Sequence, residues 1–447
     1  EIVFGDWSSD VCSSDLDIIT DIGCSEFIPT PPTIWYVDLS NTSNPQTGLT
    51  WDYAFVDLHN ALNLASSGDQ IWVAAGTYYP STWDRLVSFY LNRGISIYGH
   101  FGGIGTYETD PSERDFGAPN ETILSGDLNG NGLDGSDAFR ILSVAENCRV
   151  DGFTITGTYG AGFSNIEYGA IFGDSLGNGY LEIANCRFYL NRSNDDAGAG
   201  LAVINSLIDL SVSHCVFDNN MGGVGGAMFC LNVSYVEIID STFRNNITHI
   251  TGYDGGAASF ENCNVVIRDS RFIDNESNVM NSASAGAIRS AESNLAIDNC
   301  SFINNHCSGN GGAVNFVGGL LRTKSISNSK FIGNISMNLR GGAVCDSSPN
   351  GVLITDCAFI NNTGNDGGAV SYDGNSGGRI ERTQFAGNMP NNSGGAVSIW
   401  NASVGLYNCV LAGNPSNIMG GAIGVAGDAV GLLKLIPCTI SHNKETE

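Results

Sequence analysis

The sequence predicts an all-β fold, a right-handed parallel β-helix solenoid with an N-terminal capping helix, and three observations support this prediction. A motif of two short strand-like segments recurs every 26–30 residues from residue 181 to residue 447. An Asn follows every copy at a fixed distance, and a Gly-rich segment precedes most copies. Glycine accounts for 58 of the 447 residues whereas charged residues account for only 15%. Many tight turns between short stacked strands would produce this composition.

Each repeat is anchored on a large apolar residue. The anchors are Phe188, Phe217, Phe243, Phe272, Phe302, Phe331, Phe359, Phe385, Leu411 and Ile440. An Asn lies three residues after every anchor: Asn191, Asn220, Asn246, Asn275, Asn305, Asn334, Asn362, Asn388, Asn414 and Asn443. An aliphatic residue lies five positions before each anchor, and Cys, Ser or Thr lies two positions before it. The consensus is therefore V-x-I-x-[ND]-[CST]-x-F-x-x-N.

The spacing inside the consensus predicts strands and corners. V-x-I and [CST]-x-F alternate with a period of two, which is typical of short strands with one buried face. The [ND] between them interrupts the alternation and predicts a corner, because Asn and Asp tolerate left-handed backbone. The Asn after Phe marks a second corner, and Gly-Gly-Ala segments such as Gly311-Gly312-Ala313 supply a third strand. We expect three strands per coil, with the Asn side chains stacked as a ladder. The L-x-x-L-x-L pattern of the rival leucine-rich solenoid is absent from the sequence.

The chain divides into four segments. Residues 6–16 resemble one reading frame of a sequencing adapter, so residues 1–16 are interpreted as an artefact and left out of the fold. Residues 17–34 are Pro-rich and predict a linker. Residues 35–180 predict the N-terminal cap and irregular coils, with an amphipathic helix over residues 51–65 as the cap. Residues 181–447 predict the regular coils, and we expect further sequence beyond both ends, including any export signal.

Two family resemblances follow from these motifs. The GGA[VI] and F-x-x-N tetrapeptides of residues 181–443 resemble those of chlamydial polymorphic outer-membrane proteins. The segments WYVD, GDQIWVAAGTYYP, ETILSGDLNGNG and VDGFTITG resemble the start of secreted β-helix proteins of the pectin-lyase-like superfamily from environmental bacteria. Together the resemblances imply a β-helix exported to the bacterial cell surface, with adhesion as its role. They do not imply catalysis, because this fold carries enzymes and non-enzymes alike.

The charge of the chain limits its partners. The sequence has 19 basic and 46 acidic residues, a net charge of −27. Nucleic acids and anionic membranes would be repelled, whereas divalent cations and neutral glycans would not. No apolar stretch reaches the ~18 residues that a membrane-spanning helix needs.

Two features of the sequence bear on metal binding and redox chemistry. Residues 127–132 match the first half of a D-x-[DN]-x-[DN]-G calcium loop, although Ala138 replaces the closing Glu. The candidate Ca²⁺ ligands are Asp127, Asn129, Asn131, Asp134 and Asp137; a Gly- and Asn-rich surface loop is the alternative. Six of the 13 Cys occupy the position where other coils have Ser or Thr. These six are interpreted as small buried side chains, and the absence of CxxC spacing disfavours zinc.

The function stays open between three hypotheses. The first is a non-catalytic extracellular or cell-surface rod that binds polysaccharide or a surface protein. The candidate glycan contacts are Trp83, Tyr253, Tyr372 and Trp400. The second is a polysaccharide-active enzyme, a lyase before a hydrolase, in which stacked loop acids such as Asp218 would lie near Arg244, Arg268 and Arg271. No catalytic residue is assigned, because these side chains form no unique constellation. The third is a structural spacer.

Overall fold

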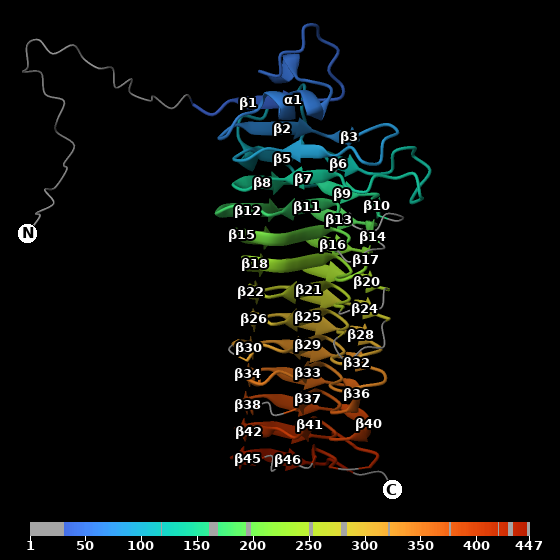
Figure 1. Cartoon of the computed structure of the whole chain (residues 1–447), viewed down its shortest axis with the longest axis vertical. Helices are drawn as coiled ribbons and strands as arrows, with labels where there is room; N and C mark the ends of the chain where they lie inside the picture. Colours follow the sequence, from blue (N-terminus) through green and yellow to red (C-terminus); the bar gives the residue numbers. More distant parts are fainter. Residues whose placement is uncertain are drawn as a thin grey trace, which may run out of the picture. The chain divides into compact units, whose positions relative to one another are not determined.

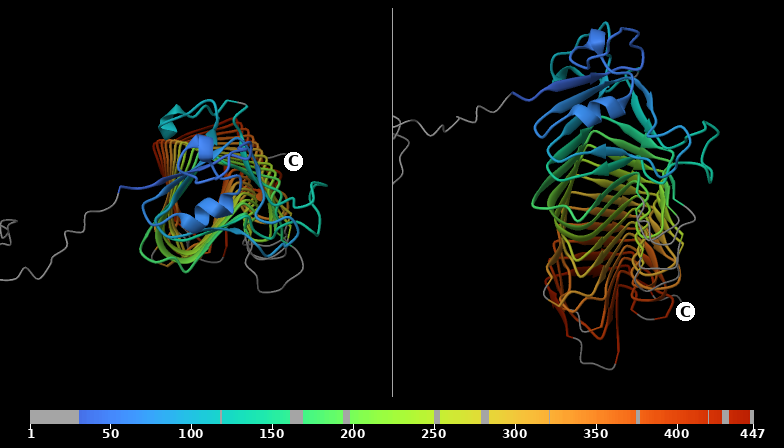
Figure 2. Two further views of the ribbon diagram at one scale, coloured as in Figure 1. Left: turned by 90° about the horizontal axis from the view of Figure 1, so that it is seen from above. Right: turned by 45° about the horizontal axis from the view of Figure 1, so that its top comes forward.

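The computed structural model describes residues 31–444, apart from short gaps, and the chain from Thr33 onward forms one compact unit. The described ranges are 31–117, 119–160, 169–193, 198–249, 254–278, 284–320, 322–374, 377–418, 420–427 and 432–444. This unit is a parallel β-solenoid of about 12 turns, as predicted. Its coils stack one above another, and viewed from above their strands superimpose (Figures 1 and 2). Among the described residues, no helix has the length and apolar character that crossing a membrane requires.

The described strands form three parallel sheets, here called A, B and C. Sheet A contains β1 (Ile34–Val37), β2 (Gln70–Ala74), β4 (Phe89–Leu91), β5 (Ser96–Phe101), β7 (Leu142–Val144), β8 (Cys148–Asp151), β11 (Ile171–Asp174), β12 (Gly179–Ala184), β15 (Leu201–Ser213), β18 (Met228–Ile239), β21 (Ala258–Glu261), β22 (Asn264–Arg268), β25 (Ile288–Ala291), β26 (Asn294–Asp298), β29 (Val314–Val317), β30 (Lys324–Ser327), β33 (Val344–Asp346), β34 (Leu353–Thr355), β37 (Val370–Asp373), β38 (Gly377–Glu381), β41 (Val397–Trp400), β42 (Ser403–Tyr407), β44 (Ile423–Ala426) and β45 (Leu433–Ile436).

Sheet B contains β3 (Gly76–Tyr78), β6 (Thr122–Ser125), β9 (Thr154–Thr156), β13 (Arg187–Tyr189), β16 (Val216–Asp218), β19 (Thr242–Arg244), β23 (Arg271–Ile273), β27 (Ser301–Ile303), β31 (Lys330–Ile332), β35 (Ala358–Ile360), β39 (Gln384–Ala386), β43 (Val410–Ala412) and β46 (Thr439–Ser441). Sheet C contains β10 (Tyr159–Gly160), β14 (Arg192–Ser193), β17 (Met221–Gly222), β20 (Ile247–Thr248), β24 (Glu276–Ser277), β28 (His306–Cys307), β32 (Ile335–Ser336), β36 (Thr363–Asp366) and β40 (Met389–Ser393).

The coil differs from the predicted one in two respects. The segment after Gly-Gly-Ala and the V-x-I segment both belong to sheet A, and in β15 and β18 they run on as one strand. The [CST]-x-F segment forms sheet B, as expected. Sheet C was not predicted, because strands of two residues, such as β20, are too short to show a period in sequence.

The core is built from stacked equivalent positions. The Phe of each B strand from β13 to β39 points inward and is buried, and neighbouring rings lie 4.4 to 5.1 Å apart, nearly parallel. The corner before each B strand from β13 to β43 has left-handed backbone, as predicted: Asn185 has a φ of 51°, His214 of 54° and Asp240 of 49°. The described Cys of the [CST] position are free and buried, apart from the half-buried Cys438. Their thiols donate to carbonyls of the preceding coil, as Cys215 Sγ does to Ile183 O at 3.5 Å.

The Asn side chains form a continuous hydrogen-bonded column at the corner between sheets B and C. Asn305 Nδ2 donates to the carbonyl of Phe272 and to Oδ1 of Asn334, both at 2.9 Å. The backbone N–H of Asn305 donates to the same Oδ1 at 3.0 Å. The pattern repeats from Asn191 to Asn443. Each buried corner therefore has its polar backbone groups satisfied by the next coil.

The N-terminal helix is shorter than predicted. Helix α1 spans Leu58–Leu64, and the 3-10 helix η1 spans Trp51–Tyr53. Phe55 cannot join the helix because its backbone pairs with β1, donating to Tyr36 O and accepting from Asp38 N. Leu58 and Leu62 are buried in the main apolar core, and α1 projects inside the outline of the coils in Figure 2. Its role as a cap stays a prediction. A second 3-10 helix, η2, spans Pro111–Glu113.

Candidate functional site

The predicted glycan contacts occupy very different environments. Trp83 is 80% exposed and Trp400 is 38% exposed, the latter beneath the guanidinium of Arg340 at 4.9 Å. The prediction for Tyr372 is wrong, because this side chain points into the core from β37 and is fully buried. Its hydroxyl donates to Val352 O at 3.2 Å, and its ring occupies the space that a side chain at Gly378 would need. Tyr253 lies outside the described residues.

The candidate calcium loop is largely satisfied by its own hydrogen bonds. Asp127 accepts from the backbone N–H groups of Gly130 (2.8 Å) and Gly132 (3.0 Å). Asp134 accepts from Asn131 Nδ2 at 2.8 Å, and Asp137 accepts from the N–H of Asp134 at 2.6 Å. In the described part of the chain, no three His, Cys, Asp or Glu side chains converge as a metal site.

Asp137 is the one unusual group of this loop. Its side chain is buried, and its Oδ1 has no hydrogen-bond partner among the described residues. Burial, together with the nearby carboxylates of Asp127 and Asp134, raises its pKa to about 6. Asn129 Nδ2 donates to Ser136 Oγ, so it also serves the loop itself. Ca²⁺ binding by this loop stays a prediction.

Two of the arginines that the catalytic hypothesis names, Arg244 and Arg268, each pair with an acid. Asp218 is buried and accepts from Arg244 at 2.7 Å, with Arg187 at 3.5 Å. These arginines hold the pKa of Asp218 below its usual value despite burial, which raises it. Arg268 pairs with Glu237 at 3.2 Å. These groups satisfy each other, so they are not arranged around a reacting bond.

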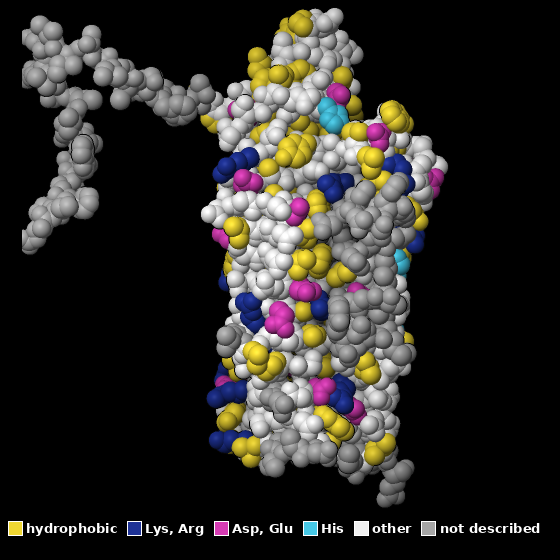
Figure 3. Space-filling view, viewed as in Figure 1, with side chains coloured by type: hydrophobic (Ala, Val, Ile, Leu, Met, Phe, Trp, Pro, Cys, Tyr) yellow, Lys and Arg dark blue, Asp and Glu magenta, His cyan; other side chains and the backbone are white. Residues whose placement is uncertain are grey.

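A different site lies on the outer face of sheet A, near the N-terminal end of the solenoid. It is a pocket of about 360 Å³, which we name the Tyr90 pocket. The side chains that matter for its chemistry are Tyr90, Arg140, Ser143, Glu146, Phe172 and Asp174. Figure 3 shows the face over which sheet A runs, with charged side chains of both signs interspersed and not gathered by sign.

The register of sheet A brings the aromatic floor of the Tyr90 pocket together. Tyr90 of β4 pairs with Ser143 of β7, which pairs with Phe172 of β11, so the three outward side chains form one column. Tyr90 is 55% exposed, whereas Phe172 and the equivalent positions further along, Ala202 and Phe229, are buried. This outward column is therefore most accessible at Tyr90 and Ser143.

Charged side chains complete the pocket. The Arg140 guanidinium lies over the Phe172 ring at 4.0 Å and donates to Ser143 Oγ at 3.2 Å. Glu146 is held by Arg93 at 3.2 Å, and Asp174 ends β11 with an exposed carboxylate. An aromatic ring beside carboxylate and guanidinium groups can pack on an apolar face of a ligand and bond its hydroxyls. Two carboxylates in one pocket also suit acid–base work.

Sequence reasoning missed this pocket. Tyr90 lies between the buried Phe89 and Leu91, an alternation that marks an outward-facing residue. However, Arg140 and Asp174 lie 50 and 84 positions further on, in irregular coils that the repeat does not cover. Only the strand register shows that they share one face.

Comparison with known proteins concerns the fold. No protein-family model matches the chain, and no curated protein matches its sequence. Solved structures that match include pectate lyase Pel9A (14% identity, TM-score 0.39, 90% of this chain and 79% of that chain). A second is the GH136 lacto-N-biosidase from Eubacterium ramulus (12% identity, TM-score 0.46, 92% of this chain and 68% of that chain). A third is the polygalacturonase from Erwinia carotovora ssp. carotovora (11% identity, TM-score 0.31, 92% of this chain and 97% of that chain). These neighbours are parallel β-helix proteins like this chain, and at such scores they carry no argument about activity.

Proposed function

We propose that this chain is an extracellular polysaccharide-binding β-helix and that the Tyr90 pocket holds a sugar unit of the polymer. The observation that carries the proposal is the exposed Tyr90 ring beside Arg140, Glu146 and Asp174 in one pocket. Sugars present an apolar ring face edged by hydroxyls, and this combination of groups complements both. Trp83 does not line this pocket, and its 80% exposed side chain is a separate candidate for contact with the polymer.

The charge balance favours a neutral polymer. Within and beside the pocket, the two positive charges of Arg140 and Arg93 balance the two negative charges of Glu146 and Asp174. These four groups therefore leave no excess positive charge to attract an anionic polymer. The net charge of −27 opposes the approach of a polyanion at low ionic strength.

Cleavage of the bound polymer is the second candidate function. Glycoside hydrolysis uses two carboxyl groups about 5–9 Å apart, on either side of the scissile bond. Glu146 and Asp174 share the pocket, and Arg140 could stabilise a developing negative charge there. A lyase would produce unsaturated sugar ends, whereas a hydrolase would produce reducing ends alone.

The test is retention of the whole chain on a panel of neutral and acidic polysaccharides, with new reducing ends and unsaturated products followed in parallel. We expect retention by at least one neutral polymer and retention about ten-fold weaker in Tyr90→Ala. Tyr53→Ala is the matched control, because this exposed tyrosine lies outside the pocket.

Two results decide between the proposals. Retention that is equal in Tyr90→Ala and in the wild type would place binding elsewhere and refute the proposed site. Product formation that is lost in both Glu146→Gln and Asp174→Asn would establish the enzymatic alternative.

A further inference from the structure

A second concave site lies at the corner between sheets A and B, where the irregular coils meet the regular array. It has a volume of about 360 Å³ and is lined by His100, Phe116, Glu121, Thr154, Arg187 and His214 among others. We name it the His100 pocket. One wall comes from residues 102–117, which follow β5 and which we name the strap. Regular coils turn this corner with one left-handed residue, so the strap distinguishes this corner from theirs.

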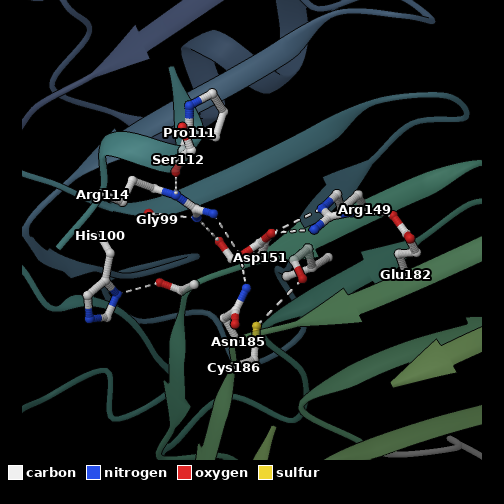
Figure 4. Close-up of polar contacts among 12 residues, drawn as sticks. Gly99, His100, Pro111, Ser112, Arg114, Arg149, Asp151, Glu182, Asn185 and Cys186 are labelled. Carbon is white, nitrogen blue, oxygen red and sulfur yellow. Dashed lines mark hydrogen bonds and ion pairs between the residues drawn. The ribbon is translucent and has the colours of Figure 1, made fainter. Parts of the chain in front are cut away.

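A buried ion pair fastens the strap to the solenoid (Figure 4). Arg114 donates to Asp151 Oδ1 at 3.1 Å and to Gly99 O at 3.2 Å; its side chain is 5% exposed and that of Asp151 is 1% exposed. Asp151 also accepts from Arg149 at 2.7 Å and from Asn185 at 2.9 Å. Separating a buried pair is costly, so these contacts hold the strap and two successive coils in one arrangement.

The same arrangement orients the polar groups of the pocket. His100 Nδ1 lies 2.7 Å from Gly152 O, and a carbonyl only accepts, so Nδ1 carries the proton. In the neutral imidazole, Nε2 is then an acceptor. The His100 ring packs against the half-exposed Phe116, with ring centroids 5.1 Å apart. Glu121 Oε1 accepts from Thr154 Oγ1 at 2.6 Å, which fixes the carboxylate.

The positive charge of the pocket is already compensated. Arg187 lies 3.5 Å from Asp218 and 4.3 Å from the centre of the Tyr189 ring. The imidazole of His214, the other basic group, lies 3.6 Å from Asp240. An anionic ligand would thus compete with Asp218 and Asp240 and face Glu121 as well. A ligand rich in hydroxyls would instead find acceptors at Glu121 and His100 and a donor at Arg187.

We propose that the His100 pocket binds a neutral mono- or disaccharide unit, at a site separate from the Tyr90 pocket. Its volume lies at the lower end of the ~300–1,000 Å³ typical of small-ligand sites, which suits one or two sugar rings. Glu121 and His100 Nε2 accept hydrogen bonds from sugar hydroxyls, Arg187 donates to a ring or hydroxyl oxygen, and Phe116 packs against the apolar ring face.

The experiment is isothermal titration calorimetry of the whole chain with lactose, maltose, cellobiose, xylobiose and mannobiose. We expect at least one of these sugars to bind, and Glu121→Gln and Phe116→Ala each to weaken its binding about ten-fold. Tyr107→Ala is the matched control, because this exposed aromatic residue lies in the strap but its hydroxyl bonds Asp52 outside the pocket. Thermal melting of each variant shows that it is folded.

Either of two outcomes overturns the proposal: no heat of binding with any of the five sugars, or undiminished binding in both folded pocket variants. The result is independent of the proposed polysaccharide site. Tyr90→Ala should leave disaccharide binding unchanged, and Phe116→Ala should leave retention of the polymer unchanged.

Discussion

Removing one side chain from the Asn column should cost far more stability than removing a hydrogen-bonded Asn from the surface. In Asn305→Ala, four hydrogen bonds disappear. Two are those that Asn305 Nδ2 donates to Phe272 O and Asn334 Oδ1. The other two are those that Asn305 Oδ1 accepts from the backbone N–H (3.1 Å) and Nδ2 (2.9 Å) of Asn275.

The expected loss follows from what remains unpaired. Two backbone groups lose the partner that Asn305 gave them: the N–H of Asn275 and the carbonyl of Phe272. Both lie in a fully buried corner that water does not reach. A buried polar group without a partner costs about 1–3 kcal/mol. Two such groups therefore lower the free energy of unfolding by about 2–6 kcal/mol, and the small cavity left by the amide adds to this loss.

The assay is equilibrium urea unfolding followed by circular dichroism, with Asn294→Ala as the control in the same coil. Asn294 donates to Asn264 Oδ1 at 2.6 Å and accepts from the N–H of Thr323 at 2.7 Å, but these bonds are exposed. Water replaces them, so the control should lose less than about 1 kcal/mol. A loss below 1 kcal/mol in Asn305→Ala, or equal losses in both variants, would refute the reasoning that burial makes the column stabilising.

Three further predictions concern the N-terminal half. If the 127–137 loop binds Ca²⁺, the cation should raise the melting temperature of the wild type and not of Asp127→Ala; no shift in the wild type would exclude the ion. In metal-free buffer, the raised pKa of Asp137 means that the folded state favours the protonated carboxyl. The stability that this protonated carboxyl contributes is therefore lost as pH rises from about 4 to about 6. Asp137→Asn should therefore be more stable than the wild type at pH 7.5, by about 1–3 kcal/mol, and equal to it at pH 4; a variant less stable at pH 7.5 would contradict this sign. If α1 caps the solenoid, replacing the buried Leu62 with Ala should cost about 2–5 kcal/mol in urea unfolding, whereas the exposed Leu64→Ala should be near neutral.

Much of the regular array could be predicted because each coil repeats the same local chemistry. The inward Phe, the left-handed corner at Asn185 or Asp240 and the Asn three residues after the anchor each have a local cause that recurs in successive coils. Repetition turned weak local preferences into a firm prediction of stacking. The two-residue strands of sheet C could not be predicted, because so short a segment shows no periodic pattern of apolar residues.

Predictions for single aromatic side chains were less successful. Tyr372 and Tyr90 are both flanked by strand-like sequence, yet one is buried in the core and the other is exposed. In a strand, a one-residue difference in register reverses which face a side chain occupies. The helical spacing of apolar residues around Phe55 predicts that Phe55 belongs to the helix. Backbone hydrogen bonds to β1 instead hold Phe55 extended.

The sequence alone determined the architecture of this protein: stacked parallel coils, their apolar columns and the Asn column that joins them. Only the tertiary structure decided where its two pockets lie. Tyr90, Arg140 and Asp174 come from three different coils, and Arg114 reaches Asp151 from the strap. Such sites arise in the irregular coils, where no period relates one residue to the next and contacts between residues far apart in sequence depend on strand register and burial.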